Sequence, residues 1–372
     1  MMEQIKNDNV NGEQIKNGKI GDEQINDEKV DYIQEKNISK IKWAFITILP
    51  FLIFVVSLFL GRYTISVTET LQIIGHYIFG MEFEPTWTDS AAKVVIQVRL
   101  PRAIMAALVG AGLSMSGAAY QGMFQNPLVS PFILGVSAGA SFGAALGLVL
   151  ELPYILIQLS AFLFGVFAVI ITYFLSHVYK STPVLMLVLS GTVVSAFFQA
   201  LLSIIKFTAD GDEKLPAITF WLMGSLGSVS LQDIMICAIP MLVSITGLML
   251  IRWKINVLSM GDKEARSLGI QTEKIKFAII VFSTIITSTA VSICGIIGWV
   301  GQVIPHFCRM LVGPDHKVLI PTTMFVGASY IMIVDNLCRL LTATEIPIGI
   351  LTAVIGAPIF AYLLRKTKGG WN

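Results

Sequence analysis

Residues 103–150 read AIMAALVGAGLSMSGAAYQGMFQNPLVSPFILGVSAGASFGAALGLVL and contain no Asp, Glu, Lys or Arg. Because one transmembrane helix needs about 20 apolar residues, this charge-free run predicts two crossings of a membrane. The break between them is expected at residues 125–131, since Pro127 and Pro131 cannot continue a helix. The run therefore indicates an all-α membrane protein rather than a soluble domain.

The composition of the whole chain favours the same fold class. Hydrophobic residues make up 55% of the sequence and charged residues 13%, whereas a soluble domain carries about 25% charged residues. The net charge of +2 is small and the charges are scattered, which excludes a nucleic-acid partner. The four cysteines lie in apolar surroundings without CxxC spacing, so we expect buried free thiols rather than a metal site.

Further apolar runs on both sides predict a polytopic protein with about ten transmembrane helices. The run at residues 277–308 is too long for one helix and is expected to break around Gly298, before a short further crossing. The expected crossings lie at residues 43–61, 103–150 (two), 152–179, 181–205, 234–251, 277–308 (two), 318–334 and 346–364.

The two termini are predicted to be cytoplasmic. Residues 1–40 are rich in Asn, Lys, Glu and Asp and have too few apolar residues for a core, so we expect a disordered cytoplasmic tail. Residues 41–368 form the transmembrane domain. Most Lys and Arg outside the spans fall on the side of the N-terminus, which the positive-inside rule makes cytoplasmic. We therefore expect a multi-pass protein of the cell membrane, in contact with lipid.

Four glycines follow one another at intervals of four residues in the second crossing of the opening stretch. In lipid, such a ladder lets a neighbouring helix approach closely, so we expect helix packing rather than substrate contact. These glycines are Gly135, Gly139, Gly143 and Gly147.

A short charged segment, GDKEARSLGI at residues 261–270, lies between two apolar runs on the predicted cytoplasmic side. Acidic residues near its start, Arg266 after them and Gly269 at its end are typical of a short helix. The predicted topology exposes this helix to soluble cytoplasmic proteins.

Several motifs together resemble the FecCD/BtuC family of ABC-importer permeases, which carry ferric siderophores, haem, cobalamin and similar chelates. The motifs that carry this resemblance are RLPR at 99–102, the glycine-rich run 117–122 leading into QNPL at 125–128, ILGVSAG at 133–139, WLMGS at 221–225, ARSLG at 265–269, GWVGQVIPH at 298–306, DNLCR at 335–339 and IPIGILTAVIGAP at 346–358.

The resemblance implies a type II ABC importer fold, similar to BtuC, in which two copies of the subunit or two close homologues surround a central path. It also implies two cytoplasmic ABC ATPases and an extracytoplasmic substrate-binding protein as partners. Residues 259–271 match the segment that couples family members to their ATPase, with Asp262, Glu264, Ala265, Arg266, Ser267, Leu268 and Gly269 as the coupling residues.

Two further sets of residues match functional positions of the family. Asn126, Ser181 and Thr182 match cytoplasmic gates, and Arg99, Arg102 and Arg339 match arginines that dock the binding protein. The residues themselves leave alternatives open: membrane-interface anchors for Arg99 and Arg102, an i, i+4 pair with Asp335 for Arg339, and a turn before proline for Asn126. Two positions depart from the family pattern, Ile296 in place of a frequent proline and Gln302 in place of an apolar residue.

The expected function is transport without catalysis by this chain. The sequence has no Walker A motif, so we expect no bound cofactor, and ATP and Mg²⁺ would be used by the partner ATPase. A ferric siderophore is the expected cargo, with haem, cobalamin, molybdate or tungstate as alternatives. An ion-driven secondary transporter would need acidic residues inside the spans, and a membrane enzyme would need clustered catalytic side chains; neither pattern is present.

Overall fold

The computed structural model describes residues 40–177 and 183–366. Contacts divide the chain into two units, residues 1–45 and 46–372. The first turns of helix α2 (Lys40–Phe59) fall in the first unit, and the other features below belong to the second. The predicted tail, apart from Lys40, and the gate residues Ser181 and Thr182 lie outside the described ranges.

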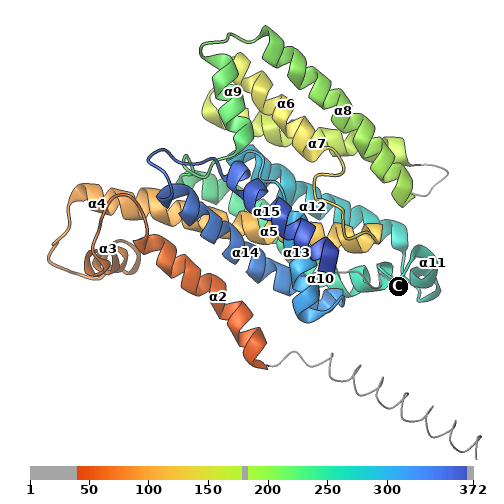
Figure 1. Cartoon of the computed structure of the whole chain (residues 1–372), viewed down its shortest axis with the longest axis horizontal. Coiled ribbons are helices and arrows are strands. Elements are labelled where there is room, and N and C mark those ends of the chain that lie inside the picture. Colours follow the sequence, from red (N-terminus) through yellow and green to blue (C-terminus); the bar gives the residue numbers. More distant parts are fainter. Residues whose placement is uncertain (1–39, 178–182, 367–372) are drawn as a thin grey trace, which may run out of the picture. The chain divides into compact units, whose positions relative to one another are not determined.

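Every regular element in the described ranges is a helix (Figure 1). In chain order they are α2 (Lys40–Phe59), α3 (Val67–Phe79), α4 (Asp89–Lys93), the π-helical η1 (Val94–Arg99), α5 (Leu100–Phe124), α6 (Val136–Val149), α7 (Tyr154–Ser176), α8 (Val184–Thr208), α9 (Lys214–Met223), α10 (Leu231–Leu258), α11 (Asp262–Ser267), α12 (Thr272–Cys294), α13 (Val300–Val312), α14 (His316–Leu340) and α15 (Ile348–Lys366).

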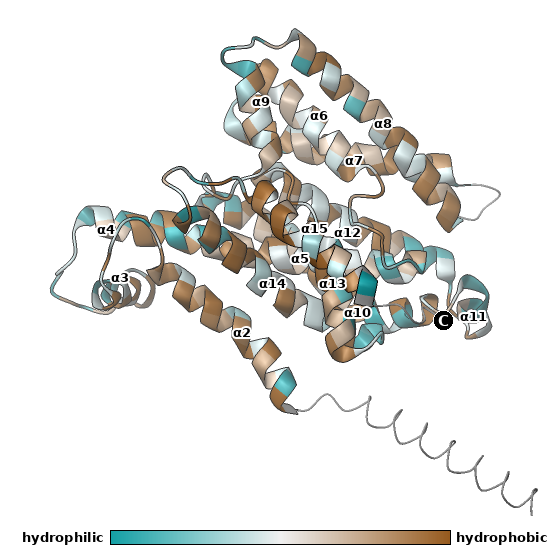
Figure 2. Cartoon of the chain, in the orientation of Figure 1, coloured by the Kyte–Doolittle hydropathy of each residue, from teal (hydrophilic) through white to brown (hydrophobic). Residues whose placement is uncertain are grey.

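The lengths of these helices confirm an all-α polytopic membrane protein. In the described ranges, seven helices are long and apolar enough to span a membrane, and Val136–Val149 and Ile348–Leu363 are shorter apolar helices. Figure 2 shows the apolar residues spread along these long helices. With the short α13 after the break at residues 295–299, the arrangement agrees with the expectation of about ten crossings.

Both predicted breaks lie where the sequence places them. Helix α5 ends at Phe124, and Gln125 adopts the left-handed conformation with a φ of 51° before α6 begins at Val136. Helix α12 ends at Cys294, and Trp299, with a φ of 69°, directly precedes α13. The two charge-free runs therefore each form two helices.

Helix α5 is the central element of the second unit, and nearly all of its residues are buried. Its glycines let neighbouring backbones come close: a Cβ added at Gly110 would lie 2.2 Å from the Gly327 carbonyl oxygen on α14, and one at Gly117 would lie 1.7 Å from that of Gly301 on α13. Such distances are too short for any side chain. Small residues thus set the spacing of α5 from both neighbours.

The predicted glycine ladder lies between α6 and α7. A Cβ at Gly139 would lie 2.4 Å from the Phe164 carbonyl oxygen, and one at Gly143 would lie 2.5 Å from that of Ser160. Gly135 differs, because it is the N-cap residue of α6 and faces Ser195 of α8. The glycines of the ladder therefore pack against two helices, α7 and α8, instead of one.

We predict that Gly143→Ala destabilises the protein, because the added methyl group would overlap the Ser160 backbone and push α7 away from α6. An overpacked site of this kind costs about 1–3 kcal/mol. Thermal unfolding in detergent would measure the loss. Gly211→Ala is the control, since nothing lies within 4 Å of a Cβ at Gly211, and an equal effect of both substitutions would contradict the packing role.

Candidate functional site

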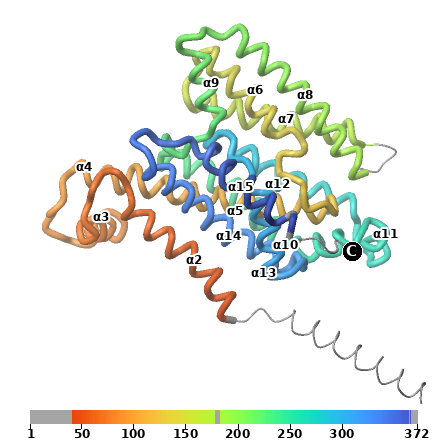
Figure 3. The backbone as a smooth tube through the Cα atoms, viewed as in Figure 1, coloured from red at the N-terminus to blue at the C-terminus, as the bar shows by residue number. Residues whose placement is uncertain are grey.

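The predicted coupling segment forms the short helix α11 and a tight C-terminal cap. Gly269, with a φ of 79°, donates its N–H to the Arg266 carbonyl at 3.0 Å, and Ile270 donates to the Ala265 carbonyl at 3.0 Å. These two bonds form a Schellman motif, which favours glycine at the left-handed position. Figure 3 shows the chain leaving α10, turning through α11 and entering α12.

The coupling residues divide into an inner and an outer group. Ala265 is buried, and the Asp262 carboxylate points to α12. Leu268 is 60% exposed, although leucine is a residue that usually packs inside. The exposed members of the set are Glu264, Arg266, Ser267, Leu268 and Gly269.

Two ion pairs join α11 to the first turns of α12. The Lys276 ammonium lies 2.5 Å from Asp262 Oδ2, with a side chain only 1% exposed, and Arg266 lies 3.5 Å from Glu273. A buried ammonium without a carboxylate partner is strongly destabilising. The pair therefore makes α11 and the start of α12 one structural unit. The position of Lys276 among charges just before an apolar run was a usable signal for this contact.

The Asn126 turn lies beside this unit and has the geometry of an Asx-turn. Asn126 Oδ1 accepts the Leu128 N–H at 2.9 Å, which is the turn role that the sequence left open. Gln125 Nε2 donates to the Leu258 carbonyl at the end of α10, at 3.4 Å. The turn that resembles a gate thus contacts the helix that leads into α11.

Gln302, which departs from the family pattern, holds the same turn from the other side. Its Nε2 donates to the Leu128 carbonyl at 2.9 Å, and its own carbonyl accepts from Gln121 Nε2 at 3.3 Å. Gln121 Oε1 in turn accepts from Arg309 at 3.0 Å. Helix α13 is therefore joined by hydrogen bonds to α5 and to the loop that follows it.

The three arginines that match docking positions are buried within the chain. Arg99 is 2% exposed and donates to the carbonyls of Leu58, Phe59 and Tyr63. Its contacts anchor the end of α2 to η1. Docking of a binding protein by Arg99 stays a prediction, and these contacts favour anchoring.

Arg102 and Arg339 surround one buried carboxylate. Arg102 donates to both oxygens of Asp335, at 2.8 and 3.0 Å, and binds Glu345 at 2.9 Å. Arg339 lies 3.4 Å from Asp335, which is the i, i+4 pair considered as the alternative, and it also donates to Asn336. No local sequence pattern points to Glu345, because its partner lies 243 positions away. The docking role of Arg102 and Arg339 likewise stays a prediction.

The described residues contain no group of three or more His, Cys, Asp or Glu side chains that could hold a metal ion. Cys237, Cys294, Cys308 and Cys338 are buried free thiols, as predicted.

These features together define a polytopic membrane protein with a glycine-packed helix bundle, an exposed helix α11 between two spans, and buried ion pairs between the spans. The FecCD transport family matches residues 48–366, and the chain belongs to this family.

Named relatives and one solved structure match most of the chain. It is 41% identical to the molybdate import system permease protein MolB of Haemophilus influenzae, over 88% of this chain and 96% of the relative. It is 36% identical to a Helicobacter pylori protein named for iron chelatin transport, over 85% and 95% of the two chains. A structure described as an inward-facing metal-chelate type ABC transporter has 40% identity and a TM-score of 0.78, with 88% of this chain and 99% of the other covered. The chain is therefore a permease of the FecCD transport family.

We predict strong coupling between Arg102 and Asp335. Either Arg102→Met or Asp335→Asn alone should lower the free energy of unfolding by about 3 kcal/mol, because each removes the closest partner of a buried charge; Arg339 remains near Asp335 and Glu345 remains near Arg102, which keeps the loss at the lower end for a broken buried pair. The double variant should lose less than the sum of the two single losses. Chemical unfolding in detergent would measure all three values, and simple additivity of the losses would contradict the pairing.

Proposed function

We propose that the chain acts as one of two copies of a permease subunit, with two cytoplasmic ABC ATPases below it and an extracytoplasmic binding protein above it, and that it imports a ferric siderophore. Both termini are then cytoplasmic. The observation that carries the proposal is the match to the FecCD family over residues 48–366, together with an exposed helix α11 that has Leu268 at its end.

Helix α11 is suited to receive force from a soluble partner. Its outer face offers Arg266 and Leu268, one charge and one apolar side chain, to an ATPase surface. Its inner face is fixed to α12 by the Asp262–Lys276 pair. A displacement of α11 would therefore reach α12 directly instead of being absorbed by a flexible loop.

The displacement would next reach the Asn126 turn. Helix α10 contacts Gln125 through the Leu258 carbonyl, and α12 packs along α5. Closure of the ATPases on ATP would thus move α11, α10 and α12 against the end of α5, where the proposed gate lies. Rigid-body motion of this kind is a common basis for alternating access.

The nature of the cargo rests on the spans and on the relatives. The spans offer mainly apolar and hydroxyl side chains, and the Asp, Glu, Lys and Arg that lie in their buried parts are engaged by other protein groups. Such surroundings suit a large chelate whose ligands shield the metal. A second candidate is molybdate, because the 41% identity to the molybdate permease covers nearly the whole of that protein.

We predict that Leu268→Asp lowers the amount of cargo transported per ATP hydrolysed by about tenfold in proteoliposomes that contain the ATPase and binding protein, because the charge disrupts an apolar contact of α11. Leu341→Asp is the matched control, since Leu341 is 56% exposed but follows the end of α14, whereas α11 packs against α10 and α12. Full coupling in Leu268→Asp would exclude the coupling role.

We predict that a strain lacking this gene fails to accumulate radiolabelled iron supplied as a siderophore complex, and that the wild-type chain restores uptake whereas Leu268→Asp does not. Parallel assays with molybdate, haem and cobalamin distinguish the alternatives. Restored uptake of molybdate without any effect on iron would replace the siderophore with the second candidate.

A further inference from the structure

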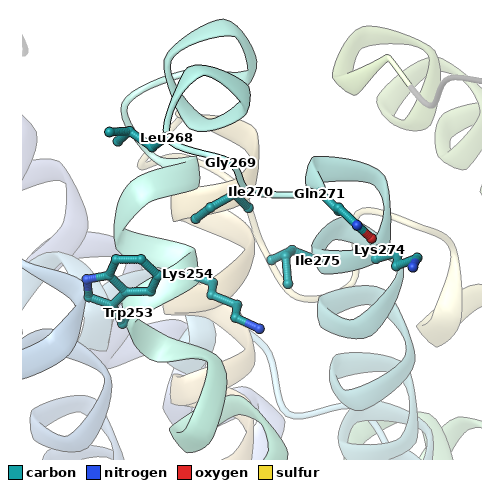
Figure 4. Close-up of a pocket in the computed structure, with 8 residues that line it drawn as sticks. All are labelled: Trp253, Lys254, Leu268, Gly269, Ile270, Gln271, Lys274 and Ile275. Atoms are coloured by element: carbon teal, nitrogen blue, oxygen red, sulfur yellow. The ribbon is translucent and has the colours of Figure 1, made fainter.

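A cavity of about 360 Å³ lies where α10 ends and α12 begins, next to the cap of α11. Figure 4 shows Trp253 and Lys254 on α10, Lys274 and Ile275 on α12, and the loop from Leu268 to Gln271 between them. The side chain of Lys254 reaches into the space between the two helices.

The cavity is basic. Lys254 and Lys274 are both exposed, and no salt bridge joins either to a carboxylate in the part of the chain that the structure describes. The nearby acidic residues are engaged elsewhere, Asp262 by Lys276 and Glu273 by Arg266. Within residues 40–177 and 183–366, two lysine side chains therefore line the cavity without a carboxylate in an ion pair with either of them.

The residues around the cavity are those expected at the edge of a membrane. An exposed apolar stripe follows α10 and leads to Trp253 and Lys254; its members are Met235, Ile239, Leu242, Val243 and Leu250. Leu250, 79% exposed, precedes Lys254 by four residues and so shares its helical face. On α12, Phe277 is 50% exposed three residues after Lys274. Trp and Lys at the end of a lipid-facing stripe are typical of the headgroup level.

We propose that this cavity binds the phosphate group of an anionic phospholipid, with Lys254 and Lys274 contacting the phosphate and the acyl chains lying along Leu250 and Phe277. Basic pockets between transmembrane helices are suited to such headgroups. The inference rests on the proposed function only in placing the lipid in the cytoplasmic leaflet.

A lipid fits this cavity better than an acidic side chain of the ATPase. An exposed apolar residue lies beside each lysine on its helix, Leu250 beside Lys254 and Phe277 beside Lys274. An acyl chain matches this apolar surface, whereas the surface of a soluble protein does not. The occupant would join the ends of α10 and α12 just beside the cap of α11. A bound lipid would then stabilise the same unit that the Asp262–Lys276 pair holds from within.

The test uses the purified full-length chain in nanodiscs of phosphatidylcholine with and without phosphatidylglycerol, and counts retained phosphatidylglycerol by native mass spectrometry. Replacing both lysines, Lys254→Gln with Lys274→Gln, should weaken phosphatidylglycerol binding by about tenfold or more, because each lysine near an anionic surface contributes appreciably. The control Lys93→Gln with Lys317→Gln removes two exposed lysines outside the cavity and should leave binding unchanged.

Three results would overturn the proposal. One is equal phosphatidylglycerol retention by the cavity variant and the wild type. Another is displacement of the lipid by millimolar inorganic phosphate, which would indicate a site for free phosphate. The third is weaker ATPase binding by the cavity variant in pure phosphatidylcholine with unchanged lipid retention, which would assign the lysines to protein docking. Lipid binding is measured on the permease alone. A negative result for lipid binding would therefore leave the proposed function, which the uptake assays test, unaffected.

Discussion

Close approach of backbones at glycine is the constraint on which this helix bundle depends. Lipid tails are as apolar as leucine side chains, so helices in a membrane gain little from hiding apolar surface and associate through tight packing instead. Helix α5 meets α14 at Gly110 and α13 at Gly117, in both cases against a glycine of the neighbour. A side chain at either position would separate the helices, and the central place of α5 would be lost.

Because α5 is central, it also connects the two ends of the bundle. At its N-terminal end Arg102 is held by Asp335 of α14 and by Glu345 in the loop before α15. At its C-terminal end the Asn126 turn is held by Gln302 of α13 and, through Gln125, by α10. Helix α5 thus connects the buried ion pairs at one end of the bundle with the Asn126 turn at the other. Under the proposed function, motion of α11 would act on this helix.

Much of this architecture follows from local sequence, and the missing parts are those set by distant contacts. Charge-free runs and prolines predict the spans and both breaks, and an acidic start with a terminal glycine predicts α11. The partners of Arg102 lie more than 230 positions away, so no local pattern reveals that its guanidinium is buried. Helix α3 was not predicted, because residues 62–93 mix polar and aromatic side chains, although the capping box of Ser66 and Glu69 was a usable signal.

The buried ammonium of Lys276 has a consequence for the evolution of the chain. In an exposed pair such as Arg266 and Glu273, either residue can be substituted alone, because water solvates the charge that remains. Positions 262 and 276 have no such freedom, since losing the Asp262 carboxylate would weaken the neutralisation of an ammonium that is sealed from water. Among descendants of this sequence the two positions should change together or not at all. Such covariation would follow from their contact at the junction between α11 and α12.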